Sequence, residues 1–216
     1  MRIVTIGLLA LLTSQVSAQK LASPDGNLLL ELQLKKGGVP VYQLSYKGKA
    51  VIAPSRLGLE MEEASLSGGF TRMDVENRSL DETWSPVWGE YSQIRNQYNE
   101  MAVTFVQKQQ RERTVLLRFR LFNDGLGFRY ELPEQDHLNY LIVKDELTEF
   151  NLTGNHKMFC IPGDYDTNEF AYTTAPISEI KVGIEKSLNK KGYESRATAF
   201  SVQTPLMMKT SEGLYI

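Results

Sequence analysis

The sequence has 216 residues, of which 23% are charged, and its formal net charge is −2 at pH 7. Its Lys and Arg residues are scattered and form no basic stripe, so neither nucleic acid nor an anionic membrane is an expected partner. The single cysteine, Cys160, cannot form an intrachain disulfide. The fold therefore has to depend on a hydrophobic core, in which we expect Cys160 to be a small buried side chain.

Residues 1–18 have the pattern of a secretory signal peptide. Met1-Arg2 is followed by the apolar run Ile3–Leu12, which is too short to span a bilayer, and Val16-Ser17-Ala18 matches the small-residue cleavage pattern. The alternative is a buried N-terminal helix or strand. We expect cleavage after Ala18, export to the periplasm, and a mature protein of residues 19–216 that forms one domain without a membrane span.

After this segment, alternating apolar residues predict a first pair of strands. A leucine occupies every second position from 28 to 34, and this run ends at Gly37-Gly38, which indicates a turn. A second alternating run at residues 42–46 ends at Lys47-Gly48-Lys49. These two runs are expected to pair as antiparallel strands.

A second hairpin is the best-defined local structure in the sequence. Apolar residues occupy every second position from Val115 to Leu121, and Phe128 and Tyr130 begin a return strand. Between them, Asn123-Asp124-Gly125 predicts a tight turn, because glycine readily accepts positive φ.

The remaining strands are short and closely spaced. They are expected at residues 138–143, 147–152, 158–161, 198–202 and 205–208, whereas residues 178–188 have only a weak helical pattern. Such spacing favours an all-β fold, an antiparallel β-sandwich. The apolar residues Leu214-Tyr215-Ile216 follow a turn and begin a strand that stops, so we expect the sandwich to be truncated at its C-terminal end.

Residues 84–100 contain both tryptophans, two tyrosines and many amide and charged side chains. Aromatic faces cover sugar rings while polar groups bind the hydroxyls, so this composition suits contact with carbohydrate. The alternative is a long loop that is held by aromatic packing and by an ion pair from Arg95 to Glu90 or Glu100. No standard catalytic motif is present, and His137 and His156 are both expected to be solvated.

Residues 163–170 form an acidic segment with oxygen ligands at Asp164, Asp166 and Asn168, as at the start of an EF-hand loop. The match then fails, because Glu169 stands where the loop needs glycine and Ala175 stands where it needs glutamate. The segment therefore has the character of a hard-metal site without a complete set of ligands, and a solvated turn remains an open alternative.

Several longer stretches give the chain a resemblance to glycoside hydrolase family 97, and within it to the α-glucosidases of bacterial starch-utilisation systems. The matching stretches are Leu21–Gly26, Ala53–Glu60, Asp81–Glu100, Arg118–Tyr130, Ile161–Thr167, Leu206–Thr210 and Gly213–Ile216. The resemblance implies an N-terminal super-β-sandwich, similar to galactose mutarotase, that packs on a (β/α)₈ barrel. In that family the catalytic carboxylates lie on the barrel, beyond residue 216, so the chain alone is expected to be inactive.

The resemblance also implies one metal ligand in this chain. By its place after the Gly-Asp-Tyr-Asp-Thr motif, Glu169 corresponds to the glutamate that ligates calcium in the family, so we expect an incomplete calcium site here. An α-glucoside or oligosaccharide would bind through the barrel. Two alternatives stay open: a free-standing carbohydrate-binding module that uses Trp84 and Trp88, and an envelope interaction protein without a role in sugar binding.

Overall fold

The computed structural model describes residues 18–108, 112–136, 140–164, 169–189 and 201–216. The chain divides into two compact units, Met1–Asn151 and Leu152–Ile216. The first unit contains two four-stranded antiparallel sheets, so the predicted all-β sandwich is confirmed. Within the described ranges, no helix has the length and apolar character needed to cross a bilayer.

The first sheet has the strand order β1-β2-β3-β4, and all neighbouring strands are antiparallel. Its strands are β1 (Gln19–Ala22), β2 (Leu28–Lys35), β3 (Val39–Tyr46) and β4 (Lys49–Arg56). The leucine alternation acts as predicted, since Leu28, Leu30 and Leu32 are buried. Lys47 and Gly48, between β3 and β4, both have positive φ (49° and 77°), which is the hairpin geometry that matches the twist of the strands.

The second sheet has the order β6-β7-β8-β9 and is also antiparallel. Its strands are β6 (Phe70–Trp84), β7 (Ile94–Lys108), β8 (Glu112–Leu121) and β9 (Leu126–Glu131). The predicted β8–β9 hairpin is confirmed, and the backbone N–H of Phe122 donates to the carbonyl of Gly125 (2.8 Å). The expected positive φ was wrong, because none of the residues 123–125 has one. The hairpin closes through this backbone bond instead.

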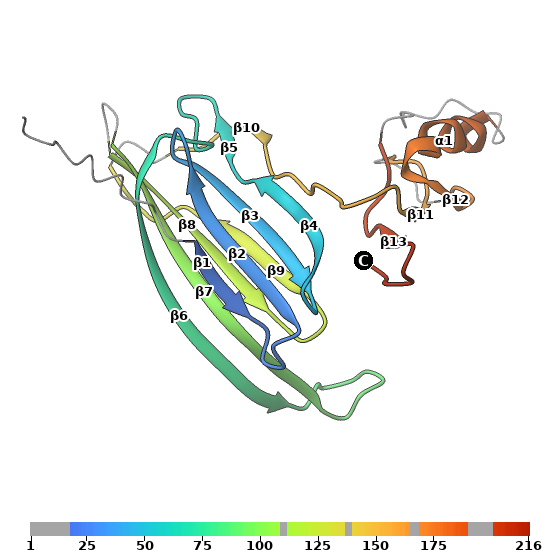
Figure 1. Ribbon diagram of the computed structural model, residues 1–216, viewed down its shortest axis with the longest axis horizontal. Coiled ribbons are helices and arrows are strands. Elements are labelled where there is room, and N and C mark those ends of the chain that lie inside the picture. The colour runs from blue at the N-terminus through green and yellow to red at the C-terminus, as the bar shows by residue number, and fades with distance from the viewer. Residues whose placement is uncertain (1–17, 109–111, 137–139, 165–168, 190–200) are drawn as a thin grey trace, which may run out of the picture. The chain divides into compact units, whose positions relative to one another are not determined.

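Figure 1 shows the strands of the two sheets in the first unit. Side chains of both sheets form one hydrophobic core. Tyr42 on β3, Met101 on β7 and Phe119 on β8 are completely buried. Burial of each such apolar side chain stabilises the fold by about 1.5–3 kcal/mol. The hydroxyl of Tyr42 donates to the carbonyl of Glu149 (2.8 Å), so its polar atom is satisfied, and burial raises the pKa of Tyr42.

A small sheet pairs β5 (Leu59–Met61) with β10 (Val143–Glu146). The strand predicted at 138–143 is wrong for its described part, because the strand begins only at Val143 and residues 138 and 139 lie outside the described residues.

The strand predicted at 147–152 is also wrong, although this segment lies beside the end of β4 and the residues that follow it. The backbone N–H of Leu147 donates to the carbonyl of Gly58, and that of Glu149 donates to Arg56 (both 2.9 Å). These hydrogen bonds hold the segment at the edge of the sheet, but they do not form a regular β-ladder. The alternating apolar residues of this segment are therefore not part of a strand.

The second unit contains a three-stranded antiparallel sheet of order β12-β11-β13. Its described elements are β11 (Lys157–Cys160), β12 (Thr173–Pro176), the 3₁₀ helix η1 (Ile177–Glu179), α1 (Ile180–Asn189) and β13 (Met207–Lys209). The strands expected at 158–161 and 205–208 thus correspond to β11 and β13. Of the strand expected at 198–202, residues 198–200 lie outside the described residues, and Val202 forms a single bridge with Pro162.

The central place of Phe119 in the core predicts a large effect of its removal. We expect Phe119→Ala to lower the free energy of unfolding by about 3–5 kcal/mol, because it leaves a cavity between the sheets. Tyr140→Ala is the control, since Tyr140 is 83% exposed, and it should change stability by less than about 0.5 kcal/mol. Urea unfolding of the purified chain measures both, and equal midpoints would contradict this account of the core.

Candidate functional site

The aromatic-rich segment is the end of a long β-hairpin. β6 and β7 pair continuously from Arg72↔Val106 to Trp84↔Ile94, whereas β8 pairs with β7 only from Asn99 onward. Beyond Asn99 the hairpin is therefore a two-stranded ribbon, which Figure 1 shows as the lower ends of β6 and β7. The alternative of a long loop over residues 84–100 is wrong for residue 84 and for residues 94–100, which are strand, and the loop is confined to residues 85–93.

The tip of this ribbon exposes large apolar side chains. Trp84 is 50% exposed, Trp88 88%, Tyr91 70% and Val87 completely. We call these four residues the aromatic tip. The ion pair expected from Arg95 to Glu90 or Glu100 was also wrong, because Arg95 binds Asp81 across the strand pair through Nε–Oδ1 (2.8 Å) and Nη2–Oδ2 (2.7 Å).

A shallow recess of about 230 Å³ lies between β1 and the base of the hairpin. Asn99 donates through Nδ2 to the carbonyl of Ala22 (2.9 Å), and Ser79 donates to Oδ1 of Asn99 (2.7 Å). Its lining residues are Lys20, Leu21, Ala22, Asn77, Arg78, Ser79 and Asn99. Neither tryptophan belongs to this lining, so the recess and the aromatic tip are separate features.

The two faces of β7 have different roles, because successive side chains of a strand point to opposite sides of the sheet. Met101, Val103 and Phe105 enter the core. Glu100 lies on the opposite face, and the register places it across from Arg78 on β6 and Arg120 on β8. The sequence alternation thus brings charged side chains together on the face that does not enter the core.

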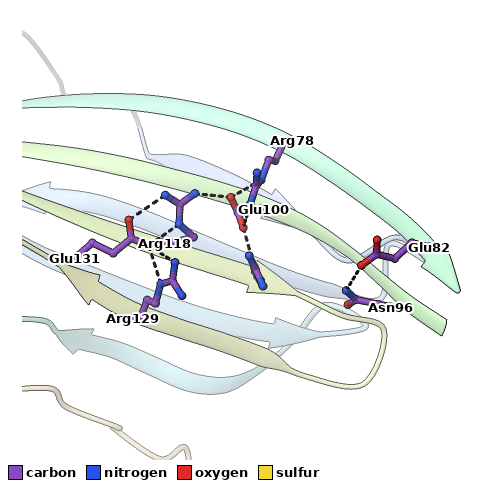
Figure 2. Close-up of polar contacts among 8 residues, drawn as sticks. Arg78, Glu82, Asn96, Glu100, Arg118, Arg129 and Glu131 are labelled. Atoms are coloured by element: carbon purple, nitrogen blue, oxygen red, sulfur yellow. Dashed lines mark hydrogen bonds and ion pairs between the residues drawn. The ribbon is translucent and has the colours of Figure 1, made fainter. Parts of the chain in front are cut away.

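Glu100 is the centre of an arginine network that joins three strands (Figure 2). Its Oε1 accepts from Nε of Arg78 and from Nη1 of Arg118 (2.6 Å each), and its Oε2 accepts from Nε of Arg120 (2.7 Å). The side chain of Glu100 is only 1% exposed. A carboxylate in this position has to be neutralised by several donors, and the three guanidinium groups do so.

The network extends to β9 through a second carboxylate. Arg118 binds Glu131 in a bidentate manner, through Nε–Oε1 (2.6 Å) and Nη2–Oε2 (3.0 Å), and Arg129 also donates from Nε to Oε1 of Glu131 (2.7 Å). The guanidinium group of Arg120 lies over the ring of Tyr98 at 4.5 Å. Four arginines therefore surround two glutamates and leave this group with a net charge of +2.

These interactions keep both carboxylates ionised. Burial acts to raise the pKa of Glu100, but the hydrogen bonds from Arg78, Arg120 and Arg118 outweigh it and lower the pKa to about 2. The hydrogen bond from Arg118 is the main cause that lowers the pKa of Glu131 to about 2. Since neither residue can be protonated near neutral pH, neither could donate a proton as a general acid. We call this network of ion pairs the brace; its members are Arg78, Glu100, Arg118, Arg120, Arg129 and Glu131.

The residue expected to bind a metal, Glu169, lies in the second unit and is exposed. Asp164 is buried, with 7% exposure, while Asp166 and Asn168 lie outside the described residues. Across the ranges that the structure describes, no group of three or more His, Cys, Asp or Glu side chains could hold a metal ion. The described part of the acidic segment therefore contains no complete set of ligands of these types.

Three other predicted positions have clear outcomes. Cys160 is buried, as expected, and burial raises the pKa of its thiol, which keeps it protonated. The prediction that His156 is solvated was wrong, because His156 is 7% exposed and precedes the buried residues of β11. His137 lies outside the described residues. Ala18, the expected cleavage position, is partly exposed and directly precedes β1.

The protein-family model described as Glycosyl-hydrolase 97 N-terminal matches residues 21–216. Among solved structures, a glycoside hydrolase family 97 enzyme from Pseudoalteromonas sp. strain K8 in complex with panose is 31% identical, with a TM-score of 0.78, over 91% of this chain and 27% of that chain. The acarbose complex of such an enzyme from the same strain is 32% identical, with a TM-score of 0.77 and the same coverage.

A β-arabinopyranosidase is similar in fold alone, at 21% identity and a TM-score of 0.70, over 88% of this chain and 29% of that chain. The chain thus spans between a quarter and a third of the length of the solved structures that it matches.

The brace predicts an acid-sensitive contribution to stability. Because the folded-state pKa of Glu100 is about 2 and its ordinary value is 4.5, its contribution is present above pH 4.5 and is lost as the pH falls toward 2. We expect Glu100→Gln to lower the free energy of unfolding at pH 7 by about 3 kcal/mol, since it removes the carboxylate that Arg78 and Arg120 bind and leaves Arg118 with Glu131 alone. The variant should lose less stability than the parent between pH 4.5 and 2.

Glu82→Gln is the matched control, because Glu82 is exposed on the same hairpin and accepts only one hydrogen bond, from Asn96 (2.9 Å). Denaturant unfolding of the three proteins across this pH range makes the comparison. Parallel pH profiles for the parent and Glu100→Gln would show that the brace does not couple to folding.

Proposed function

The chain belongs to the Glycosyl-hydrolase 97 N-terminal family, and we propose that it is the N-terminal, carbohydrate-associated domain of an exported hydrolase that acts on α-glucosides. In this proposal the domain packs on a catalytic barrel, which carries the general acid and base, and it supplies one calcium ligand. The observation that carries the proposal is the shared fold over 91% of the chain with family 97 enzymes that bind panose and acarbose.

The chemistry of the described carboxylates supports a positioning role for this domain. Hydrolysis of a glycosidic bond needs two carboxyl groups on either side of the bond, one of which has to be protonated. Glu100 and Glu131 both have pKa values of about 2 and are bound by arginines. Their protons are lost far below neutral pH, so we assign the acid and base of the reaction to the barrel.

In this proposal the ligands of the calcium ion come from both this chain and the barrel. Calcium takes about six to eight oxygen ligands, and Glu169 is an exposed carboxylate that can contribute one or two of them. No described group of three acidic, His or Cys side chains accompanies it, so we assign the other ligands to the barrel. When bound, the ion would supply a fixed positive charge beside the substrate.

The position of the first strand supports export with cleavage after Ala18. β1 begins at Gln19, and its residues pair with β2 from Gln19↔Leu32 to Ala22↔Leu29. Removal of residues 1–18 would therefore leave the complete first sheet in the mature protein. The periplasm is the compartment that we propose.

A free-standing carbohydrate-binding module is the second candidate, and the exposed aromatic tip favours it. Aromatic rings that face solvent can cover the apolar faces of sugars. The two functions differ in whether the isolated chain binds glycan, because the proposed hydrolase domain needs the barrel for substrate binding.

The calcium proposal is tested in a chimera in which residues 19–216 replace the matching part of the Pseudoalteromonas enzyme. We expect this chimera to hydrolyse p-nitrophenyl α-glucoside, and Glu169→Gln to weaken its calcium affinity at least about tenfold, because the change removes one ligand charge. Glu179→Gln, another exposed carboxylate of the same unit, is the control and should leave the affinity unchanged. Calorimetric titration that gives equal affinities for Glu169→Gln and the parent would make Glu169 an ordinary loop residue.

Export is tested on the full 216-residue chain in a Gram-negative host. We expect the periplasmic fraction to contain a product that begins at Gln19, and Ala18→Arg to block this cleavage, because the enzyme that removes signal peptides requires a small residue there. Lys20→Arg, two residues later, should be processed normally. Intact-mass measurement reads the cleavage position, and a cytoplasmic product that keeps Met1 would contradict export.

A further inference from the structure

The side of the hairpin ribbon that carries the arginine network also carries apolar side chains, which the hydrogen-bonded pair Glu82–Asn96 divides into two groups. The register pairs Leu80 with Tyr98 and Trp84 with Ile94. Because side chains alternate along a strand, these even-numbered residues share one face with Glu100, which is also even-numbered. Leu80 and Tyr98, which is buried beneath Arg120, form one apolar group beside the network, and Trp84 and Ile94 form the other at the aromatic tip.

The surface beside Leu80 and Tyr98 is positively charged. Four arginines surround two glutamates, and the bonds of Arg120 within this group use only its Nε, on Glu100. Those of Arg129 use its Nε and Nη2, on Glu131. The side chain of Arg129 is 65% exposed and that of Arg120 is 36% exposed. Guanidinium N–H groups remain on this face that can bind further carboxylates in a planar, bidentate manner.

The chemistry of this surface suits a protein better than a sugar. Trp, Tyr and Arg are the residues that contribute most to protein–protein binding, and they are all present here. The fully exposed Val87 and the aliphatic Leu80 and Ile94 add apolar area that has no use in stacking on a sugar ring. The arginines outnumber the glutamates on this face, even with Glu82 included, and this excess of positive charge favours a partner with acidic side chains.

We propose that this face, from the aromatic tip to Arg120 and Arg129, is the surface on which the catalytic part of the same enzyme docks. The inference rests on the proposed function, and its partner follows from length, since the family 97 enzyme that this chain matches is more than three times as long as this chain. An apolar pocket on the partner would receive Trp84 and Trp88, and its carboxylates would lie opposite the arginines. The brace at Glu100 holds the strands from which both groups project.

Cysteine labelling tests the proposal. Val87→Cys introduces a thiol at the fully exposed position of the tip, while the natural Cys160 is buried. Lys36→Cys, in the exposed β2–β3 turn, is the matched control. We expect a maleimide to label Val87→Cys at least tenfold more slowly in the chimera described above than in the isolated chain, and to label Lys36→Cys equally fast in both. Peptide mass spectrometry reads each site.

The outcome separates the docking surface from the proposed function. Fast labelling of Val87→Cys in a chimera that hydrolyses α-glucoside overturns the surface and leaves the function intact. Slow labelling in an inactive chimera supports the surface and counts against the function. If the isolated chain is already protected, either at higher protein concentration or by added maltoheptaose, then a second copy or a sugar is the occupant and the proposal is wrong.

A second variant tests the role of charge. Arg129→Ser in the chimera should speed the labelling of Val87→Cys severalfold, because it removes an exposed donor that faces the partner. Arg72→Ser, which loses an exposed pair with Asp74 at the far end of β6, should not change the rate. Equal rates for the two variants would show that the arginines do not contribute to docking.

Discussion

The buried carboxylate of Glu100 is the constraint on which the second sheet depends. It lies where the two-stranded ribbon of β6 and β7 joins the wider sheet, next to the last β7–β8 pair, Asn99↔Leu121. Its bonds reach β6 through Arg78 and β8 through Arg118 and Arg120. A slip of one residue would turn Glu100 toward the core, where its charge has no partner. The network therefore fixes the register of three strands at the base of the hairpin.

The same strand has to satisfy the core on its other face. Met101, Val103 and Phe105 alternate with Glu100, so the register that pairs the charges also buries the apolar side chains. The two contributions differ in kind. Apolar burial supplies most of the stability, whereas a buried ion pair often contributes little net stability but is costly to break. We infer that the core makes the sandwich stable and that the brace sets the direction in which the ribbon leaves it.

Local patterns were enough to predict the strands 28–34 and 115–121, because alternation and turn residues lie within a few positions of each other. The brace was not predictable in this way, since Arg78 and Glu100 are 22 residues apart and meet only through the register of the hairpin.

The helical sequence pattern of α1 is weak partly because the helix contains Gly183. A Cβ atom there would lie 2.4 Å from Thr173, so the packing on β12 requires glycine. The polar neighbours of His156 led to the prediction of a solvated side chain. His156 nevertheless precedes Met158 and Cys160 in the same alternating positions, and it is buried as they are.

The distribution of charge and apolar surface explains what this domain can contribute to an enzyme. Its buried carboxylates are bound by arginines, and a proton donor needs a carboxyl group whose pKa lies near the working pH. The same arginines leave an excess of positive charge beside an exposed aromatic surface, and that combination is typical of a protein interface. The ionic network thus leaves its own carboxylates unable to act as proton donors, and the same face of the sheet carries the surface that we propose for contact with a catalytic partner.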